Sequence, residues 1–272
     1  MLGYSRVISF LDFYDHFSAE LGDRYWLTDK SFYVELQSII EEGFKIWADD
    51  ISRHLYASIL KFRFTNDYSV LPPHDYENQY FPKDIPQWLN PLRFIDCGAY
   101  DGDTLRNMLK TNLLLEAFAG FEPDQTNFVK LANFCQMKKK NLPEEVSLFP
   151  CGVSRSTEQL RFSSGQGSGS HASTVGEDVI QCVALDEALP NFRPNLIKMD
   201  IEGAENDALR GASRIIEEYH PGLAICVYHR PEHLWQIPLY IKEISGGASL
   251  YLRLHGYSAF DIVGYCINEK IV

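Results

Sequence analysis

The sequence has little basic charge. Its 25 lysine and arginine residues stand against 37 aspartate and glutamate residues, which gives a net charge of −12. The one basic run is Lys138–Lys140, and a short run of this kind is typical of the solvated end of a helix. Nucleic-acid binders and proteins of anionic membrane surfaces usually carry a basic face. We therefore expect no nucleic-acid partner and no general attachment to a membrane surface.

The sequence also lacks paired cysteines and long apolar runs. None of its six cysteines lies in a Cys-x-x-Cys pair, and Cys97, Cys226 and Cys266 lie in runs typical of buried strands. Buried, reduced thiols indicate a cytoplasmic protein. No apolar run approaches the length that spans a membrane. Residues 1–17 have neither the basic start nor the continuous apolar stretch of a signal peptide.

Apolar residues make up 45% of the 272 residues, which is enough for a full core. We divide the chain into a helical N-terminal extension with a proline-rich linker, residues 1–90, and an α/β domain, residues 91–272. In the extension, apolar residues recur at helical spacing over 31–47, where Ser31 marks the start, and again from Ile51 to Phe62. The prolines of residues 69–91 exclude helices and interior strands, so we expect an ordered linker over the next domain.

The function of the extension stays open at this point, because it carries no motif. It is a candidate cap over a substrate or over a partner subunit, which leaves a homo-oligomer open. Surface packing is the more common role of its polar and aromatic residues. Those that are candidates to line a substrate are Arg53, His54, Arg63, His74, Tyr76 and Tyr80.

From Phe94 onward, strand and helix signals alternate, which indicates a mostly parallel sheet covered by helices. We expect strands over 93–99, 117–123, 146–154, 179–185, 195–203 and 222–229. Helices are expected over 103–117, 124–138, 204–219 and 233–244, and a glycine- and serine-rich loop over 163–176. The runs 249–257 and 261–267 are close in sequence, so they predict an antiparallel hairpin.

The segment Phe94–Leu109 has the layout of a nucleotide-binding βα unit: a strand, a tight turn and a helix start. Gly98 and Gly102 let the backbone approach a ligand closely, because glycine has no Cβ. Asp103 or Thr104 stands near the start of the helix, whose free N–H groups favour an anion. The spacing differs from Gly-x-Gly-x-x-Gly, since Tyr100 holds the place of the middle glycine.

Polar residues stand at the carboxyl ends of the expected strands, where ligands of such sheets bind. These residues are Asp96, Glu122, Ser154, Asp200, Glu202 and His229. Glu122 follows Asp96 by 26 residues and has the position of an acid that binds the two hydroxyls of a ribose. Together they predict one binding cleft.

Five segments, in this order, resemble the FkbM family: FIDCGAYDGDTL, GFEPD, CGVS, IKMDIEGAENDALRGA and YHRPEHLWQIP. The family consists of class I S-adenosylmethionine-dependent methyltransferases, mostly O-methyltransferases. The run Asp-Ile-Glu-Gly-Ala-Glu over 200–205 is its most diagnostic segment. The resemblance covers about residues 94–270. It implies a Rossmann-like class I methyltransferase sheet, mostly parallel, with a C-terminal antiparallel hairpin.

The resemblance also implies two sets of site residues. Those that bind S-adenosylmethionine would be Asp96, Gly98, Ala99, Gly102, Thr104, Glu122, Pro123, Gly152, Val153 and Asp200. The catalytic residues that face the acceptor would be His229, Asp200 and Glu202, with His255 less favoured. His229 or Asp200 would take the proton of the acceptor hydroxyl, with Glu202 behind them.

We therefore expect direct, in-line transfer of a methyl group to a hydroxyl of a sugar, a glycan or a related natural product. We predict no metal, because a full set of oxygen ligands for a hard cation is not visible. Two alternatives stay open. One is an NAD-type Rossmann oxidoreductase, and the other is a catalytically silent cofactor-binding module.

Overall fold

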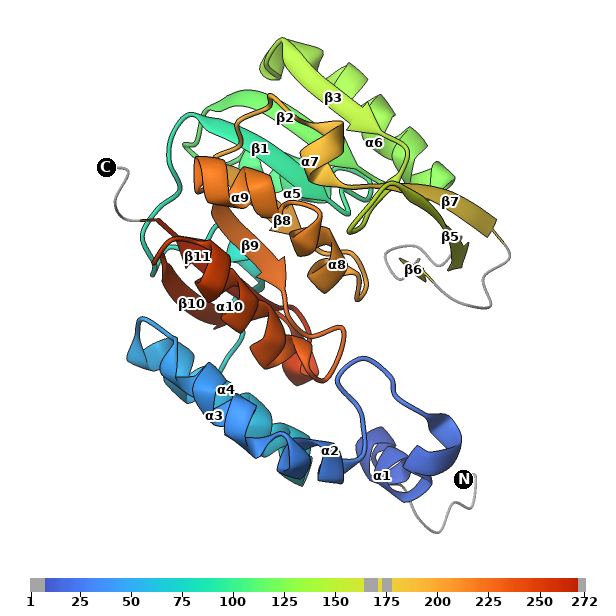
Figure 1. Cartoon of the computed structure of the whole chain (residues 1–272), viewed down its shortest axis with the longest axis vertical. Coiled ribbons are helices and arrows are strands. Elements are labelled where there is room, and N and C mark those ends of the chain that lie inside the picture. Colours follow the sequence, from blue (N-terminus) through green and yellow to red (C-terminus); the bar gives the residue numbers. More distant parts are fainter. Residues whose placement is uncertain (1–7, 164–170, 173–177, 269–272) are drawn as a thin grey trace, which may run out of the picture.

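The computed structural model describes residues 8–163, 171–172 and 178–268. Within this part of the chain, a seven-stranded sheet has the order β10-β11-β9-β8-β1-β2-β3 (Figure 1). Its parallel strands are β1 (Leu92–Cys97), β2 (Leu115–Phe121), β3 (Glu145–Phe149), β8 (Leu196–Met199) and β9 (Gly222–Cys226). β11 (Ile262–Ile267) pairs antiparallel with both β9 and β10 (Ser249–Leu254). The predicted mostly parallel sheet with a terminal antiparallel hairpin is confirmed.

The strand order places β1 between β2 and β8, so the chain leaves β1 toward one side of the sheet and returns on the other. Ligands of open α/β sheets bind at such a switch point, outside the carboxyl ends of the strands. Every residue of β8, β9 and β11 is buried, as interior strands require. Most buried strand residues are apolar, but two buried residues in this centre, Asp96 of β1 and Lys198 of β8, are charged and lie directly below the switch point.

Helices cover the sheet on both faces, and Figure 1 shows α8, α9 and α10 along one of them. The helices of this part are α5 (Asp103–Met108), α6 (Gln125–Met137), α7 (Leu185–Ala188), α8 (Glu205–Arg210), α9 (Ser213–Tyr219) and α10 (His233–Ile244). Short 3₁₀ turns lie at Lys139–Asn141 and Tyr257–Ala259. None of the helices that the structure describes is long and apolar enough to span a membrane.

The helix expected over 103–117 was predicted too long, since α5 ends at Met108. The Thr111 hydroxyl donates to the carbonyl of Met108 at 2.7 Å and accepts from the backbone N–H of Leu113 at 3.1 Å. Such local bonds compete with helical ones. The helix expected over 204–219 is also divided, because the Asp186 carboxylate accepts from the N–H groups of Arg214 and Ile215 and starts a new helix there.

The strand expected over 146–154 was likewise predicted too long, since β3 ends at Phe149. Pro150, which has no N–H, follows the end of β3, and the chain then enters a second sheet with the order β4-β7-β5-β6. Its strands are β4 (Gly152–Val153), β5 (Glu158–Ser163), β6 (His171–Ala172) and β7 (Asp178–Val183). The predicted loop over 163–176 overlaps β5 and β6, and its residues 164–170 and 173–176 lie outside the described residues.

The N-terminal extension is helical, as predicted, and consists of α1 (Phe10–Leu21), α2 (Lys30–Glu35), α3 (Gln37–Lys45) and α4 (Asp50–Thr65), with 3₁₀ turns at Tyr68–Val70 and Tyr76–Asn78. The helix expected over 31–47 begins earlier, because Asp29 caps it, and divides at Leu36. The buried apolar residues of α4 belong to the same hydrophobic core as the sheet. The division at residue 90 stays a prediction.

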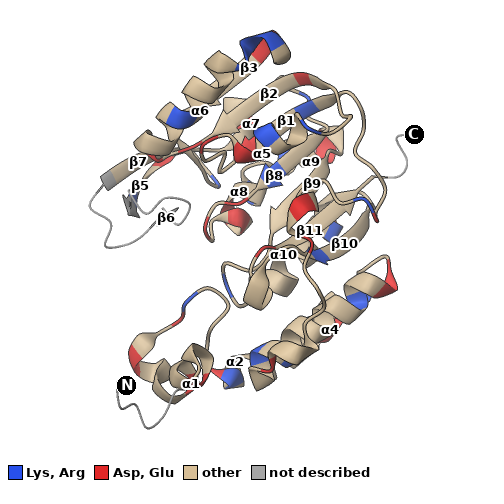
Figure 2. Ribbon diagram, turned by 180° about the vertical axis from the view of Figure 1, so that it is seen from behind, with Lys and Arg blue, Asp and Glu red and all other residues tan. Residues whose placement is uncertain are grey.

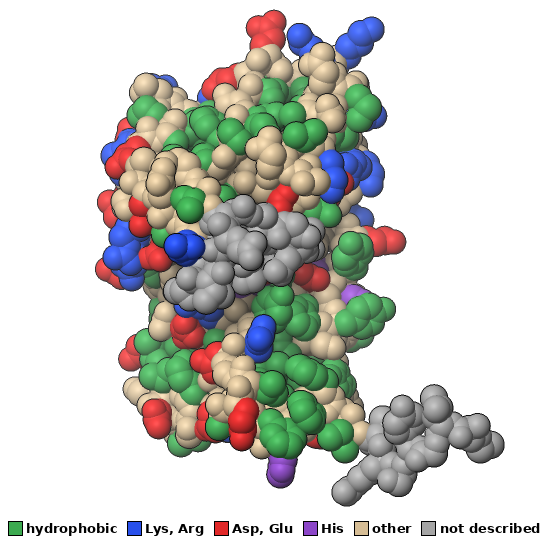
Figure 3. Space-filling model, turned by 90° about the vertical axis from the view of Figure 1, so that its right-hand side faces the viewer, with side chains coloured by type: hydrophobic (Ala, Val, Ile, Leu, Met, Phe, Trp, Pro, Cys, Tyr) green, Lys and Arg blue, Asp and Glu red, His purple; other side chains and the backbone are tan. Residues whose placement is uncertain are grey.

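Apolar side chains also lie on the surface of the extension. Figure 3 shows them in the lower part of the molecule, where the N-terminal helices lie. In α1, Phe10, Phe13 and Phe17 are partly exposed. Acidic and basic residues are instead scattered over the whole ribbon (Figure 2). The possibility of a homo-oligomer through the extension stays a prediction.

Arg253 on β10 joins the extension to the sheet. Its buried guanidinium donates to the Asp49 carboxylate at 2.7 Å, to the Ser52 hydroxyl at 2.9 Å and to the Asp84 carboxylate at 2.7 Å. These partners come from the start of α4 and from the linker. One cation therefore holds two segments of the extension to the edge of the sheet.

We expect Arg253→Ala to lower the free energy of unfolding by about 3 kcal/mol, because it removes one partner of a largely buried ion pair and leaves Asp49 behind. Urea denaturation followed by circular dichroism measures the loss. Arg155→Ala is the control, because its pair with Asp207 is exposed, and it should change stability by about 0.5 kcal/mol or less. Equal stability of the two variants would contradict this role of Arg253.

Candidate active site

A cavity of about 290 Å³ lies at the carboxyl ends of β1, β2 and β8. Its wall combines the turn after β1, the end of β2, the loop after β8, strands of the second sheet and part of the linker. The predicted site residues that line it are Gly98, Thr104, Glu122, Pro123, Gly152, Val153, Asp200 and Glu202. Asp96, Ala99, Gly102 and His229, also predicted, are not part of this wall. The fold therefore brings most of the predicted site together.

The turn after β1 is fixed by its backbone. The N–H groups of Gly98 and Ala99 donate to the carbonyl of Phe121 at 3.0 and 2.9 Å. Gly98 has φ +78°, and a Cβ there would lie 2.0 Å from the carbonyl oxygen of Asp200. Gly102, also at positive φ, packs against Phe134 of α6 rather than facing the cavity. Glycine at 98 thus lets the turn after β1 and the loop after β8 touch.

Asp96 is completely buried and forms an ion pair with Lys198, whose Nζ lies 3.0 Å from its carboxylate. Burial raises the pKa of Asp96 to about 6, although the ammonium group lowers it. Burial alone would lower the pKa of Lys198, but the carboxylates of Asp96 and Asp200 raise it. Lys198 also donates to the carbonyl of Gly98 at 2.7 Å. Asp96 therefore supports the turn through Lys198 and lies beneath the wall of the cavity. Its direct contact with a cofactor stays a prediction.

Glu122 follows β2 and braces the same turn. One carboxylate oxygen accepts from the N–H of Tyr100 at 2.9 Å, and the other accepts from the N–H of Asp124 at 2.9 Å. Burial raises the pKa of Glu122, while these two hydrogen bonds lower it. Each carboxylate oxygen can accept a second hydrogen bond. Glu122 can therefore hold the turn and still bind hydroxyl groups in the cavity.

The second sheet supplies an apolar wall. Gly152 and Val153 of β4 line the cavity together with Leu160 of β5, Ile180 of β7 and Phe121 at the end of β2. A Cβ at Gly152 would lie 2.8 Å from the sulfur of Cys182, so the position accepts no larger residue without movement. The combination of a flat apolar wall and a nearby carboxylate suits a base attached to a ribose.

An acidic cluster forms the opposite wall. Asp200 and Glu202 follow β8, and His229 follows β9, which pairs with β8 in parallel. The His229 Nε2 lies 3.4 Å from the Asp200 carboxylate and 3.7 Å from the Glu202 carboxylate. Its Nδ1 lies 2.8 Å from the Glu205 carboxylate, which is fully buried. The side chains of Asp200 and Glu202 are 25% and 18% exposed, and that of His229 only 1%.

The cluster shifts the protonation of its members. Burial raises the pKa of Glu202 to about 7 against the attraction of His229. Burial lowers the pKa of His229, but Glu205, Asp200 and Glu202 raise it to about 9. Burial would raise the pKa of Glu205, yet its two histidine neighbours, His229 and His233, hold it well below the usual range. In this wall, the pKa of each group depends both on its own burial and on the charge of its neighbours.

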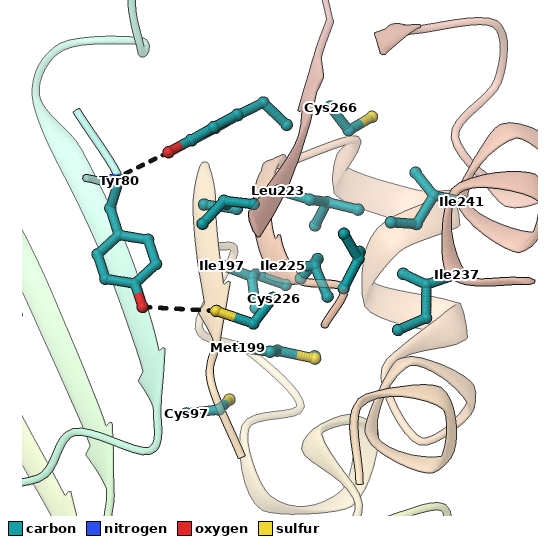
Figure 4. Close-up of a cluster of buried hydrophobic side chains, with 14 of the residues drawn as sticks. Tyr80, Cys97, Ile197, Met199, Leu223, Ile225, Cys226, Ile237, Ile241 and Cys266 are labelled. Carbon is teal, nitrogen blue, oxygen red and sulfur yellow. Dashed lines mark hydrogen bonds between the residues drawn. The ribbon is translucent and has the colours of Figure 1, made fainter. Parts of the chain in front are cut away.

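Tyr80 brings the linker into the site. Its hydroxyl donates to the Asp200 carboxylate at 2.7 Å. The same hydroxyl lies 3.6 Å from the sulfur of Cys226, a contact that Figure 4 shows as a dashed line. Its backbone N–H donates to the Tyr265 hydroxyl at 3.0 Å, and its carbonyl accepts from the indole of Trp88 at 2.8 Å. Tyr80, a residue of the linker, therefore fixes one oxygen of Asp200.

The other candidates from the extension have different positions, except Tyr76, which lines the cavity with Tyr80. Arg53 pairs with Asp50, Arg63 is buried and donates to the carbonyl of Pro231, and the ring of His74 lies on that of Tyr257. His54 and His255 line a separate cavity. His255 donates to the carbonyl of Asp75 and accepts from Tyr265, which agrees with the structural role that the sequence favoured over a place at the acceptor.

Comparison with known proteins agrees with this geometry. A family model described as the methyltransferase FkbM domain matches residues 96–258, which is more than half of the chain.

The chain belongs to the FkbM methyltransferase family.

Among solved structures, a methyltransferase FkbM from Methylobacillus flagellatus KT is similar, with 27% identity and a TM-score of 0.77. The match covers 87% of this chain and 60% of that one, so this chain spans less than two thirds of that protein. Aeropyrum pernix fibrillarin, solved with S-adenosylmethionine, is a weaker likeness: 10% identity, a TM-score of 0.40, and 65% and 67% of the two chains covered. No curated protein sequence matches this chain. The expected family and fold class are confirmed.

The sequence did not reveal the roles of three residues of this site, which are Lys198, Glu205 and Tyr80. For Tyr80, the missed role is its hydrogen bond to Asp200. Tyr80 was only one of several candidates, because a linker tyrosine carries no signal of its depth. Lys198 had a usable signal, since a lysine within an apolar parallel strand requires a buried partner. Glu205 belongs to the recognised run 200–205, but its contact with His229 depends on the pairing of β8 with β9.

We expect Gly98→Ala to destabilise the protein by about 2 to 5 kcal/mol, because it combines left-handed strain with overlap on the Asp200 carbonyl. Gly247→Ala is the matched control. Its φ is +95°, and a Cβ there meets nothing within 4 Å, so strain alone should cost about 1 to 2 kcal/mol. Thermal and urea unfolding compare the two. A Gly98→Ala variant no less stable than Gly247→Ala would show that the two loops do not need to touch.

Proposed function

We propose that the chain is an S-adenosylmethionine-dependent O-methyltransferase that methylates a hydroxyl of a sugar, a glycan or a related natural product. One observation carries the proposal: a single cavity joins a buried glutamate and an apolar wall on one side to an open pair of carboxylates on the other. The first side suits an adenosyl group, and the second suits a hydroxyl that must lose a proton. Membership of the FkbM methyltransferase family supports the reaction type.

The residues present fit S-adenosylmethionine. Glu122 would accept hydrogen bonds from the ribose hydroxyls, and Val153, Leu160 and Ile180 would contact the adenine. The absence of a Cβ at Gly98 and Gly152 keeps the backbone close on both sides. When bound, the cofactor supplies a methyl group already activated by a positively charged sulfur.

The charge of the cavity favours this cofactor over NAD. Among the described residues, its charged lining consists of Asp103, Glu122, Asp200, Glu202, Asp261 and Lys198. Five acids against one base attract a sulfonium and an ammonium group and repel a pyrophosphate. The alternative of an NAD-type oxidoreductase is therefore disfavoured by the same wall that suits a methyl donor.

The catalytic assignment follows from exposure. Asp200 and Glu202 face the cavity, so one of them would accept the proton of the acceptor hydroxyl. His229 is covered by them, and we assign it to positioning rather than to the first proton transfer. Tyr80 would keep Asp200 oriented. The exposed ring of Tyr76, which lines the same cavity, suits a sugar, because a sugar presents C–H faces and hydroxyl edges.

Binding tests the cofactor. S-Adenosylhomocysteine should raise the melting temperature and NAD should not. Glu122→Gln should weaken S-adenosylhomocysteine binding tenfold or more by calorimetry, since hydrogen bonds to a charged group contribute roughly 1.5 to 3 kcal/mol. Glu217→Gln, exposed on α9, is the control and should bind normally. Stabilisation by NAD alone would favour the oxidoreductase.

Turnover tests the reaction. With S-adenosylmethionine and a panel of sugars and sugar nucleotides, mass spectrometry should show one added methyl group on oxygen and an equal amount of S-adenosylhomocysteine. Tyr80→Phe should lower kcat about tenfold, because it removes one hydrogen bond to Asp200, and should leave cofactor affinity nearly unchanged. Cofactor binding without methyl transfer to any acceptor would instead favour the silent binding module.

A further inference from the structure

Three potential metal ligands converge in the acidic cluster. Asp200, Glu202 and His229 each offer one ligand atom, and these atoms all lie within 4.8 Å of one another. Two of them come from the loop after β8, and the third comes from the end of β9. The expectation of no metal rested on the sequence, in which His229 is 27 residues or more from both acids. The pairing of β8 with β9 assembles the set.

The ring of His229 provides an independent observation. Its side chain is 1% exposed, and its Nε2 has no hydrogen-bond partner among the described residues, although it points between the two carboxylates. The other ring nitrogen, Nδ1, donates to Glu205 at 2.8 Å. Glu205 is itself fixed, because it accepts from the N–H of Ile201 at 2.9 Å. A carboxylate on the far nitrogen is the usual way in which a protein orients a metal-binding histidine.

The spacing of the ligand atoms also suits an ion. Two ligand atoms that each lie about 2.1 Å from a metal at octahedral or tetrahedral angles are roughly 3.0 to 3.4 Å apart. The Nε2 of His229 lies 3.4 Å from Asp200 and 3.7 Å from Glu202. A direct N–H···O hydrogen bond would be shorter, near 2.9 Å. The two distances that meet at His229 are thus slightly too long for hydrogen bonds and close to those in a chelate, and the ligand atoms of Asp200 and Glu202 lie within 4.8 Å of each other.

We propose that Asp200, Glu202 and His229 bind a divalent first-row transition ion such as Mn²⁺ or Zn²⁺. Two carboxylate oxygens and one imidazole nitrogen suit these ions, whereas Mg²⁺ prefers oxygen ligands alone. The two carboxylates balance the charge of the ion, and three protein ligands leave coordination positions open toward the cavity. If the proposed function holds, those positions would take two neighbouring oxygens of the acceptor, one of which is the hydroxyl to be methylated. The oxygen of Asp200 or Glu202 that does not bind the ion would accept the proton of that hydroxyl.

Ion binding tests the site without reference to turnover. The full chain, stripped with EDTA and dialysed, is titrated with MnCl₂, ZnCl₂ and MgCl₂ by calorimetry and, for Mn²⁺, by electron paramagnetic resonance. We expect one Mn²⁺ or Zn²⁺ per chain and much weaker Mg²⁺ binding. Pulsed resonance should detect one imidazole nitrogen coupled to Mn²⁺. The absence of Mn²⁺ and Zn²⁺ binding up to millimolar concentrations would overturn the site and leave the methyltransferase proposal intact.

Variants distinguish ion binding at these three residues from nonspecific binding elsewhere on the protein surface. Asp200→Asn and His229→Ala should weaken binding at least a hundredfold, and Glu205→Gln, which only orients the histidine, tenfold to a hundredfold. Glu202→Gln, at a partly exposed position, is the variant least expected to disturb folding and should also weaken binding. His54→Asn, in the other cavity, should leave it unchanged. Binding unaffected by Asp200→Asn and Glu202→Gln, with S-adenosylhomocysteine binding retained, would contradict the assignment.

Activity tests the acceptor-binding step. EDTA should lower methyl transfer more than tenfold without changing S-adenosylhomocysteine affinity, and Mn²⁺ or Zn²⁺ should restore it. An equal rate of methyl transfer with and without the bound ion would contradict the proposed contact between the ion and the acceptor. A chain that binds the ion but neither S-adenosylhomocysteine nor a methyl acceptor would retain the ion site and overturn the proposed function.

Discussion

The close contact between Gly98 and the carbonyl of Asp200 is the constraint on which the site depends. It joins the turn after β1, which shapes one side of the cavity, to the loop after β8, which carries the acids. The buried pair of Asp96 and Lys198 lies directly below, and Lys198 donates to the carbonyl of Gly98. The two halves of the cavity therefore form one rigid unit, as the alignment of a methyl donor with an acceptor requires.

The same unit explains how so many acids are kept together. Like charges in a partly buried space repel one another strongly. Here three buried acids each have a nearby partner: Lys198 for Asp96, two backbone N–H groups for Glu122, and the ring of His229 for Glu205. Asp200 and Glu202 are partly exposed and line the cavity, which is where a cationic donor or a metal ion would be bound.

The local parts of this arrangement could be predicted from the sequence. Strand periodicity and the glycines located the turn around Gly98, and the acids at strand ends located Glu122 and Asp200, because parallel strands place their carboxyl ends at one edge. The contribution of the second sheet could not be predicted, since it begins only where Pro150 ends β3. Asp96 was assigned to the cofactor because sequence position does not distinguish a lining residue from one beneath the wall.

The N-terminal extension is part of the cavity wall in physical terms, although the family match begins only at residue 96. Tyr80 of the linker is anchored by Tyr265 and Trp88 and donates to Asp200, so the orientation of that carboxylate depends on a residue outside the matched region. Arg253 ties α4 and the linker to the same edge of the sheet. A movement of the extension would therefore change the position of the Asp200 carboxylate through one hydrogen bond. Any molecule that binds to the extension would in this way affect the acidic wall of the cavity.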